Sequence, residues 1–286
     1  MSHAIDAEWD RLGQPAEFTF VDYGAGPGTL ARAVFAARPR CREHLRYIAV
    51  ERSDLQHQFH PDGVESVAAL TAEHIGSGLT GMVFANELLD NLAFTPVRWD
   101  GETALFGVVD IDDDAEGSLV TRFVPDPQLD SALLITGQSV VDQTMAGEWA
   151  NWISTDVIAE GRMVVVDYSR QSTCDVEVRT FSEHGPAGDP LTELGNKDIT
   201  VDVDLEVLQR RVGRAASITP QHVWLRQHGI DELVEQGRII WERGAAVGGL
   251  EALRGKSRLR EADALTDPIG LGGFVVSEWA LSLIHI

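Results

Sequence analysis

Three glycines at alternate positions are the residues of this sequence best suited to hold a ligand. Gly24, Gly26 and Gly28 follow the apolar segment Phe18–Val21 and the acidic residue Asp22. This order is typical of a buried strand that passes through a tight turn into a helix. Glycines lack Cβ and let the backbone approach a ligand, and the N–H groups at a helix start can bind its polar atoms. We therefore expect a ligand at this turn.

The spacing of the glycines discriminates between ligands. A dinucleotide-binding turn requires Gly-x-Gly-x-x-Gly or Ala, because the last position packs closely on the following helix. Counted from Gly24, that position is Thr29. The spacing therefore disfavours NAD, and a purely structural glycine turn in another α/β protein stays open as an alternative.

A second acidic residue, Glu51, ends the apolar segment Leu45–Val50. It lies roughly twenty residues beyond the glycine turn, where a carboxylate accepts hydrogen bonds from the ribose hydroxyls of a bound nucleoside. This position supports a ligand that contains adenosine. The alternative is an ordinary solvated glutamate at a strand end.

A third polar cluster, Asn86-Glu-Leu-Leu-Asp90, directly follows the apolar segment Gly81–Ala85. In open α/β sheets, ligands bind beyond the carboxyl ends of the strands. We therefore expect Asn86 and Glu87 to face the same cleft as Gly24 and Glu51. The alternative is that Asn86 caps a helix and Asp90 lies in solvent.

The elements that position these residues are those of a doubly wound, seven-stranded α/β sheet. Length and hydrophobic content favour a single domain, residues 1–286, with insertions. Apolar and β-branched runs predict further strands at 64–67, 162–168 and 274–279, and helical spacing predicts a helix over residues 138–158.

Two insertions interrupt the predicted sheet. Alternating residues around Asp100-Gly101 predict a β-hairpin over residues 97–125, with an acidic loop that lacks the spacing of a calcium-binding loop. The polar stretch 170–197 is long enough to be a lid or binding loop, and it contains Arg179, His184 and Asp189. Two interpretations of His184 stay open: it contacts the substrate, or it is an exposed residue of the loop.

The composition argues against several classes of partner. A net charge of −22 would repel nucleic acid and anionic membrane surfaces. Cys41 and Cys174 lie far apart and outside any Cys/His cluster, so we predict neither a disulfide framework nor a metal site. The sequence shows no signal peptide and no membrane-spanning run, and we predict a cytoplasmic protein.

Four separated blocks of the chain resemble the MidA-like family of S-adenosylmethionine (SAM)-dependent methyltransferases. The blocks are Asp22–Leu30, Tyr47–Ser53, Asn86–Asp90, and Val166–Tyr168 followed by Thr180, His184, Asp189, Pro190, Gly195, Lys197–Thr200 and Val203–Asp204. The family includes a mitochondrial complex I assembly protein that methylates an arginine. The resemblance implies a class I methyltransferase fold, SAM as cofactor and a protein substrate, with arginine as the methylated residue.

The resemblance also implies site residues. The cofactor-binding residues are Asp22, Gly24, Gly26, Gly28 and Glu51, and the catalytic candidates are Asn86, Glu87 and Asp90. Carboxylates accept a guanidinium in bidentate geometry, which suits Glu87 and Asp90. The alternatives are a non-catalytic assembly factor that keeps the fold and, less favoured, an NAD-linked oxidoreductase, for which no hydride-transfer residues are recognisable. The oligomeric state is left open.

The chain departs from the family at two places. Asn91-Leu-Ala93 replaces the family's Ala-Leu-Pro, and the family's long segment before the glycine turn is almost missing, which predicts an N-terminally truncated protein. The last residues, Leu281–Ile286, match the translation of a transposon end used in sequencing adapters. We expect them to be a non-native tail that packs on nothing. The alternative is an ordinary apolar strand segment.

Overall fold

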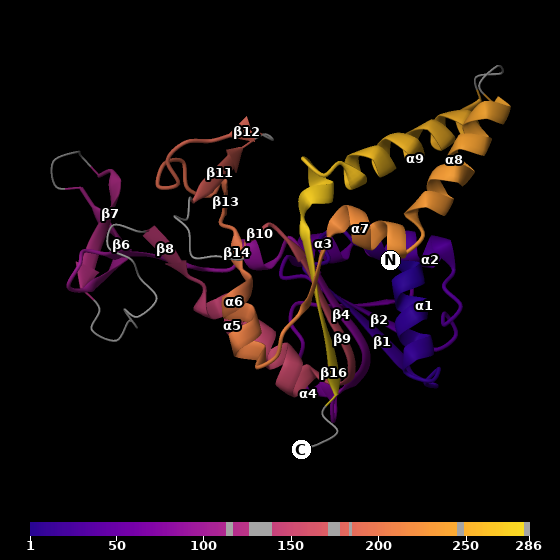
Figure 1. The fold of residues 1–286 in the computed structure, drawn as a ribbon, viewed down its shortest axis with the longest axis horizontal. Helices are drawn as coiled ribbons and strands as arrows, with labels where there is room; N and C mark the ends of the chain where they lie inside the picture. Colours follow the sequence, from indigo (N-terminus) through magenta and orange to yellow (C-terminus); the bar gives the residue numbers. More distant parts are fainter. Residues whose placement is uncertain (113–116, 126–138, 171–177, 183–184, 245–248, 283–286) are drawn as a thin grey trace. The chain divides into compact units, whose positions relative to one another are not determined.

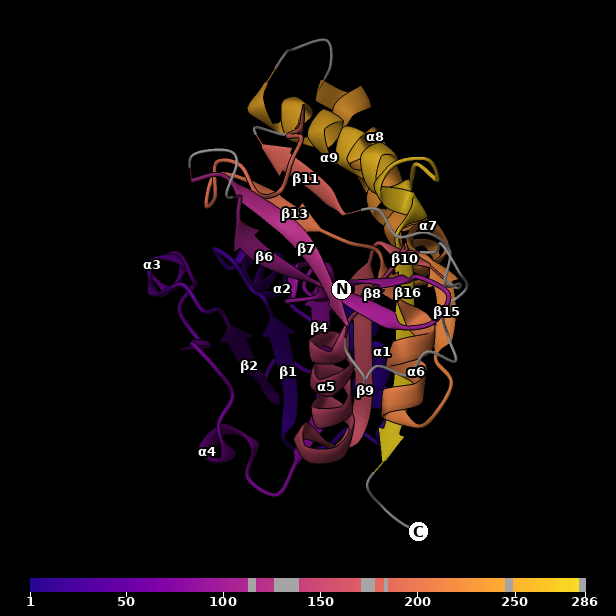
Figure 2. The same ribbon diagram turned by 90° about the vertical axis from the view of Figure 1, so that its left-hand side faces the viewer.

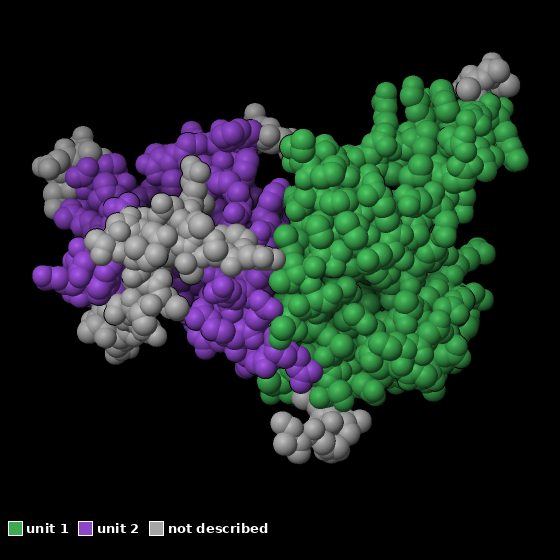
Figure 3. All heavy atoms as spheres, viewed as in Figure 1, with its two compact units in different colours: residues 1–86, 153–166, 215–286 green, residues 87–152, 167–214 purple. Residues whose placement is uncertain are grey.

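The computed structural model describes residues 1–112, 117–125, 139–170, 178–182, 185–244 and 249–282 (Figure 1). The chain divides into two compact units (Figure 3), and the single domain with insertions stays a prediction. Unit 1 contains residues 1–86, 153–166 and 215–286, and unit 2 contains residues 87–152 and 167–214. The chain thus leaves unit 1 twice, after residue 86 and after residue 166, so each segment of unit 2 follows a strand of unit 1.

Unit 1 is built on a seven-stranded sheet with the strand order β15-β16-β9-β4-β1-β2-β3 (Figure 2). The strands are β1 (Phe18–Tyr23), β2 (Leu45–Val50), β3 (Val64–Val67), β4 (Leu79–Asn86), β9 (Ile158–Asp167), β15 (Ser217–Pro220) and β16 (Val275–Ser282). The pairs β1–β2, β2–β3, β1–β4 and β4–β9 are parallel, and β15 is antiparallel to β16. The predicted seven-stranded, mostly parallel α/β sheet is confirmed.

Helices accompany the sheet of unit 1, and two of them form a long antiparallel pair near the C-terminus (Figure 1). They are α1 (Ser2–Arg11), α2 (Thr29–Ala37), α3 (Asp54–His57), α4 (Ala72–Ile75), η3 (Ile153–Val157), α7 (Gln221–Gln227), α8 (Ile230–Gly244), α9 (Leu250–Thr266) and η4 (Leu271–Gly273). The core of unit 1 is apolar on both faces of β1, where every residue from Phe18 to Asp22 is buried. Burial on both faces explains why this strand is a nearly continuous apolar run and not an alternating one.

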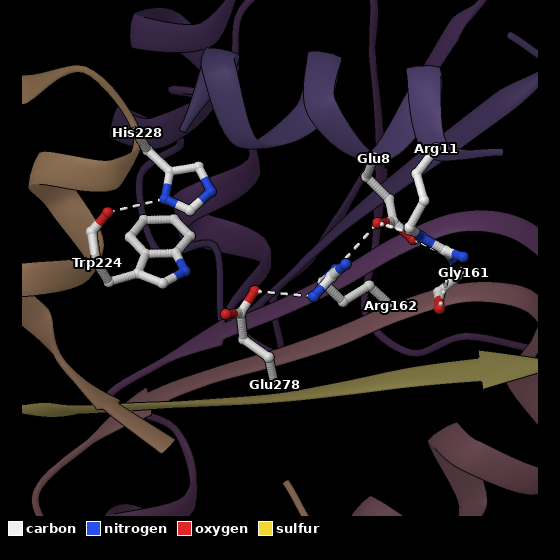
Figure 4. Close-up of polar contacts among 7 residues, drawn as sticks. All are labelled: Glu8, Arg11, Gly161, Arg162, Trp224, His228 and Glu278. Atoms are coloured by element: carbon white, nitrogen blue, oxygen red, sulfur yellow. Dashed lines mark hydrogen bonds and ion pairs between the residues drawn. The ribbon is translucent and has the colours of Figure 1, made fainter. Parts of the chain in front are cut away.

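A buried network of charges joins α1 to the sheet in unit 1 (Figure 4). The Glu8 side chain is only 2% exposed. It accepts hydrogen bonds from Arg11 at 2.9 and 2.6 Å and from Nε of Arg162 on β9 at 2.9 Å. Arg162 also contacts Glu278 on β16 at 3.4 Å. The buried Glu8 and the partly buried Glu278 therefore each face a guanidinium, which offsets the cost of removing their charges from water.

The described residues of unit 2 form three small sheets and short helices. The four-stranded sheet has the order β7-β6-β5-β8, the three-stranded sheet β12-β11-β13, and β10 pairs with β14. The elements are η1 (Leu89–Asn91), β5 (Thr95–Trp99), β6 (Ala104–Ile111), β7 (Leu119–Pro125), β8 (Ser139–Asp142), α5 (Thr144–Trp152), β10 (Ser169–Arg170), β11 (Arg179–Ser182), β12 (Gly185–Pro186), β13 (Asp198–Thr200), β14 (Val203–Asp204) and α6 (Leu205–Val212). The segment predicted as a hairpin, 97–125, lies in β5–β7.

The helix predicted over residues 138–158 is wrong at both ends. Residues 139–142 form β8, which pairs antiparallel with β5, and the Asp142 carboxylate accepts the Thr144 N–H at 3.1 Å at the start of α5. At the other end, Ile158 already belongs to β9. Helical spacing of apolar residues could not detect strand pairing with a distant segment, and this pairing decides the structure.

The predicted lid and the predicted tail are described in part. Residues 170–197 contribute β11 and β12, and His184 lies outside the described residues. At the C-terminus, Leu281 and Ser282 are the last residues of β16, and Leu281 is 4% exposed. The expectation that the segment from Leu281 onward packs on nothing is therefore wrong for Leu281. Residues 283–286 lie outside the described residues.

Candidate functional site

The glycine turn follows β1 as predicted. Gly24, Gly26 and Gly28 all have positive φ, at +81°, +51° and +73°. Residues with a side chain rarely adopt this left-handed region. A Cβ added to Gly26 would meet no atom within 4 Å, whereas one added to Gly28 would lie 2.8 Å from the side chain of His60. The space beside Gly28 is therefore filled by His60 of the same unit, whereas the space beside Gly26 is open.

The helix after the turn begins without a side-chain cap. Gly28 is the N-cap residue of α2 (Thr29–Ala37), and no side chain accepts a hydrogen bond from the first turn. The first N–H groups of a helix have no partner within the helix, and they bind anionic groups well. The start of α2 can therefore hold a carboxylate or another polar group of a ligand.

Glu51 lies against the glycine turn. Its Oε2 accepts a hydrogen bond from the Gly26 N–H at 3.0 Å, and its Oε1 accepts one from the Ser53 N–H at 2.8 Å. The structure thus brings together two residues that are 25 positions apart in the sequence. The side chain is partly exposed, and each carboxylate oxygen can accept a second hydrogen bond, so ribose hydroxyls could still bind here.

Asp22 is placed differently from Glu51. It is 5% exposed, and its carboxylate accepts the hydroxyl hydrogen of Tyr47 on β2 at 2.8 Å. Burial raises the pKa of Asp22 to about 6, while the hydrogen bond from Tyr47 acts in the opposite direction. Asp22 therefore links β1 to β2 immediately before the turn.

Asn86 and Glu87 follow the buried core of β4. Asn86 is the last residue of β4, and both side chains are exposed, as a residue that meets a ligand or substrate requires. Glu87 has φ +49°, a conformation that non-glycine residues adopt at a cost of about 1 kcal/mol. Such strain is frequent at functional positions.

Asp90 is buried and not in solvent. It is 3% exposed, its Oδ2 accepts the Thr200 hydroxyl hydrogen at 2.6 Å, and its Oδ1 accepts the Asn91 side-chain N–H at 2.9 Å. A guanidinium could bind both oxygens only if these two partners moved. The Asp90 side chain is also hydrogen-bonded to Asp167, and burial raises the pKa of Asp90 above its ordinary value.

Asp167 is a residue of unit 2 that is not among the site candidates predicted from the sequence. It is fully buried at the end of β9, and its carboxylate accepts the N–H groups of Leu89 at 3.0 Å and of Tyr168 at 3.0 Å. Burial, and then the negative charge of Asp90, raise the pKa of Asp167 to about 8. The signal was available in the sequence, because this strand, like β2, ends in an acidic residue.

Comparison with known proteins identifies the family. The model of a family of S-adenosyl-L-methionine-dependent methyltransferases matches residues 2–223, which include the glycine turn, Glu51 and the Asn86–Asp90 cluster. The chain belongs to this family. SAM is therefore the cofactor, as predicted, and the match favours a SAM site over the NAD alternative. The open space beside Gly26, the uncapped start of α2 and the position of Glu51 fit such a ligand.

Two curated proteins are similar to this chain in sequence. The mitochondrial protein arginine methyltransferase NDUFAF7 of Xenopus laevis is 38% identical over 74 residues, which are 25% of this chain and 17% of that protein. The mitochondrial NDUFAF7 homolog of Drosophila melanogaster is 24% identical over 241 residues, which are 71% of this chain and 54% of that protein. The chain thus spans about half the length of the longer of these two matches.

Two solved structures of Burkholderia thailandensis proteins share the fold. One is 20% identical with a TM-score of 0.79, and the alignment covers 98% of this chain and 77% of that chain. The other, bound to S-adenosyl-homocysteine, is 20% identical with a TM-score of 0.77 and covers 98% of this chain and 74% of that chain. At 20% identity, this similarity supports the assignment of the fold.

Other predictions of the sequence concern membranes, metals and cysteines. No helix within the described ranges is long and apolar enough to cross a membrane. Among the residues that the structure describes, no group of three or more His, Cys, Asp or Glu side chains is arranged to hold a metal ion. Cys41 is a buried free thiol, and Cys174 lies outside the described residues. The cytoplasmic location and the exclusion of nucleic acid remain predictions.

Proposed function

We propose that this methyltransferase transfers the SAM methyl group to a nitrogen of a protein, with an arginine as the acceptor. The observation that carries the proposal is the contact between Glu51 and Gly26, beside the uncapped start of α2. It places a carboxylate and helix N–H groups around one open turn, as a ligand with an adenosine and an amino acid part requires. The arginine specificity is supported by the names of the curated relatives.

The cofactor would supply a methyl group bound to a sulfonium sulfur, and the neutral thioether of S-adenosyl-homocysteine would be the leaving group. In our proposal the cofactor is oriented by residues of unit 1, namely Asp22, Gly24, Gly26, Gly28 and Glu51. Glu51 would accept hydrogen bonds from the ribose, and Asp22 would act indirectly, through its hydrogen bond with Tyr47. A reaction of this kind depends mainly on holding the acceptor nitrogen in line with the methyl group.

The acceptor residues of our proposal are Asn86 and Glu87. Both are exposed directly after β4, and the Glu87 carboxylate can accept two hydrogen bonds from a guanidinium. The buried Asp90, with its partner Asp167, would hold the η1 turn that follows Glu87 and thereby fix the direction of the acceptor residues. This assigns Asp90 a positioning role.

The binding part of the proposal is tested by Gly26→Val. Valine introduces branched carbons into the open space and strains a backbone with positive φ. Isothermal titration with S-adenosyl-homocysteine should show no measurable binding, while far-UV circular dichroism stays that of the wild type. Unchanged affinity would exclude the turn as the cofactor site.

The chemical part is tested with SAM labelled in the methyl group. Incubation with a lysate of a matching host should label a protein, and acid hydrolysis should recover the label in methylarginine. Glu87→Gln should reduce the labelling rate at least tenfold and change the S-adenosyl-homocysteine affinity by less than about twofold. Cofactor binding without any labelled protein would favour the non-catalytic assembly factor.

A further inference from the structure

A histidine outside the predicted site contacts the glycine turn. The His60 Nε2 donates a hydrogen bond to the Gly26 carbonyl at 2.8 Å, and its Nδ1 accepts one from the Ser66 hydroxyl at 2.7 Å. Because a carbonyl can only accept, the contact with Gly26 fixes the ring tautomer with the hydrogen on Nε2. The imidazole therefore has a defined orientation, held from β3 by Ser66.

The same ring limits the space at the next glycine. A Cβ on Gly28 would lie 2.8 Å from His60 Cδ2 and 3.2 Å from its Cα. Beside it, the Arg32 guanidinium donates to the Pro27 carbonyl and to the Phe59 carbonyl, both at 2.7 Å. Two successive carbonyls of the turn, those of residues 26 and 27, are thus bound by side chains, and each is tied to the segment 59–60.

Gly26 is held from both of its peptide groups. Its N–H donates to Glu51, and its carbonyl accepts from His60. Glycine has more backbone freedom than any other residue, so an unrestrained turn would lose much entropy on binding a ligand. A turn already fixed in the binding conformation avoids most of that loss, and this increases affinity.

We propose that His60 is a positioning residue for SAM binding, acting through the hydrogen-bonded series Ser66–His60–Gly26. This inference rests on the proposed placement of the cofactor at the glycine turn. His60 itself does not touch the cofactor in this scheme. It fixes the peptide group between Gly26 and Pro27, and so the course of the chain from the turn into α2.

The test compares His60→Ala with His60→Gln. Isothermal titration of S-adenosyl-homocysteine should show about a tenfold weaker affinity for His60→Ala, the loss of one hydrogen bond together with the order it imposes. His60→Gln retains an N–H donor and should recover at least half of that loss on a logarithmic scale. In the ligand-free protein, hydrogen exchange of residues 24–31 should be faster in His60→Ala and restored in His60→Gln.

The chain offers a matched control in His44. Its ring also hydrogen-bonds a backbone carbonyl, that of Ala16 at 3.0 Å, but before the start of β1 and not after its end. His44→Ala should leave the affinity within about twofold of the wild type. If His60→Ala binds as tightly as His44→Ala, the proposal is wrong.

The outcomes separate this inference from the proposed function. If Gly26→Val also binds normally, the cofactor site itself is misplaced. If Gly26→Val abolishes binding and His60→Ala does not weaken it, only the role of His60 is excluded. Should His60→Ala fail to fold, Ser66→Ala removes just the hydroxyl that orients the ring. That variant should bind about threefold more weakly, and an unchanged affinity would overturn the proposal.

Discussion

Two groups of buried carboxylates in this protein have opposite electrostatic surroundings. In unit 1, Glu8 is surrounded by the guanidinium groups of Arg11 and Arg162 (Figure 4). In unit 2, Asp90 and Asp167 are hydrogen-bonded to each other, and their carboxylates otherwise accept hydrogen bonds from neutral hydroxyl, amide and backbone N–H groups. The first group balances its charge, and the second does not.

This difference separates a buried charge that the packing of the fold explains from one that it does not explain. A carboxylate balanced by arginines connects α1 to two strands and needs no further explanation. Two carboxyls in contact, with only neutral partners among the described residues, favour the state in which one of them keeps its proton, and such an arrangement costs stability when the pH rises. Perturbed groups of this kind concentrate at functional sites, which supports the proposal for the Asn86–Asp90 cluster.

The largest expected effect comes from breaking the balanced group. Glu8→Ala leaves the guanidinium groups of Arg11 and Arg162 without their shared carboxylate. Removing one partner of a buried ion pair costs about 3 kcal/mol, and both arginines are partly exposed, which keeps the cost at this lower end. Urea unfolding at pH 7 should show a lower free energy of unfolding by this amount.

An exposed ion pair gives the control for Glu8. Arg42 and Glu43 contact at 3.1 Å, with side chains 57% and 76% exposed. Glu43→Ala should change the free energy of unfolding by less than about 0.5 kcal/mol. A loss for Glu8→Ala as small as that for Glu43→Ala would mean that the network does not stabilise the fold, and the contrast between the two groups would disappear.

The second effect is a pH dependence that belongs to the aspartate pair. The pKa of Asp167 is raised to about 8 in the folded protein and is about 4 in the unfolded chain. Between these values the folded state holds a proton that the unfolded state releases, so stability is greatest at low pH and falls as the pH rises toward 8. The expected slope is about −1 kcal/mol per pH unit between pH 5 and pH 7.

Asp90→Asn should flatten this slope. It removes the negative charge that helps to raise the pKa of Asp167, and the asparagine amide can still bond Thr200. Urea unfolding at pH 5, 6 and 7 measures the slope of the wild type and of the variant. Equal slopes would show that the two carboxyls do not share a proton.

Neither group's contacts follow from a local pattern in the sequence, whereas other features of the fold do. The glycine turn, Glu51 and the sheet follow from local patterns, because strand, turn and helix succeed each other within a short segment. The ion pair of Glu8 with Arg162 joins residues that are 154 positions apart, and no local pattern indicates it. The same holds for Asp90 and Thr200, which are 110 positions apart.

Sequence also failed where a residue's environment decides its role. Asp90 and Glu87 belong to one short cluster, and both were predicted to bind a guanidinium, yet one is buried and the other exposed. Asp90 belongs to the η1 turn, in which the Leu89 N–H donates to Asp167 at the end of β9, whereas Glu87 precedes that turn. A sequence motif identifies such a cluster but not which of its members faces solvent.

A smaller effect tests whether the Thr200 hydroxyl stabilises the buried pair Asp90–Asp167. Thr200 is 3% exposed, and its hydroxyl is the donor to Asp90. Thr200→Val keeps the shape and removes the donor, which should cost about 1–2 kcal/mol because a buried carboxylate oxygen loses its partner. Thr121→Val, at an exposed threonine of β7 in the same unit, should change the free energy of unfolding by less than about 0.5 kcal/mol in the same urea experiment. Equal costs would contradict the role of Thr200.

The smallest effect concerns backbone strain beside the aspartate pair, and it separates stability from function. Glu87 and Glu193 are both exposed glutamates of unit 2 with φ near +50°. Glycine adopts this conformation without strain, so Glu87→Gly and Glu193→Gly should each raise the free energy of unfolding by about 0.5 kcal/mol. If Glu87 binds the acceptor, only Glu87→Gly should reduce methyl transfer, by at least about tenfold. Equal turnover in both variants would show that the strain at Glu87 serves no function, whereas a gain in stability with a loss of activity at Glu87 alone would show that the position is kept for the reaction at the expense of the fold.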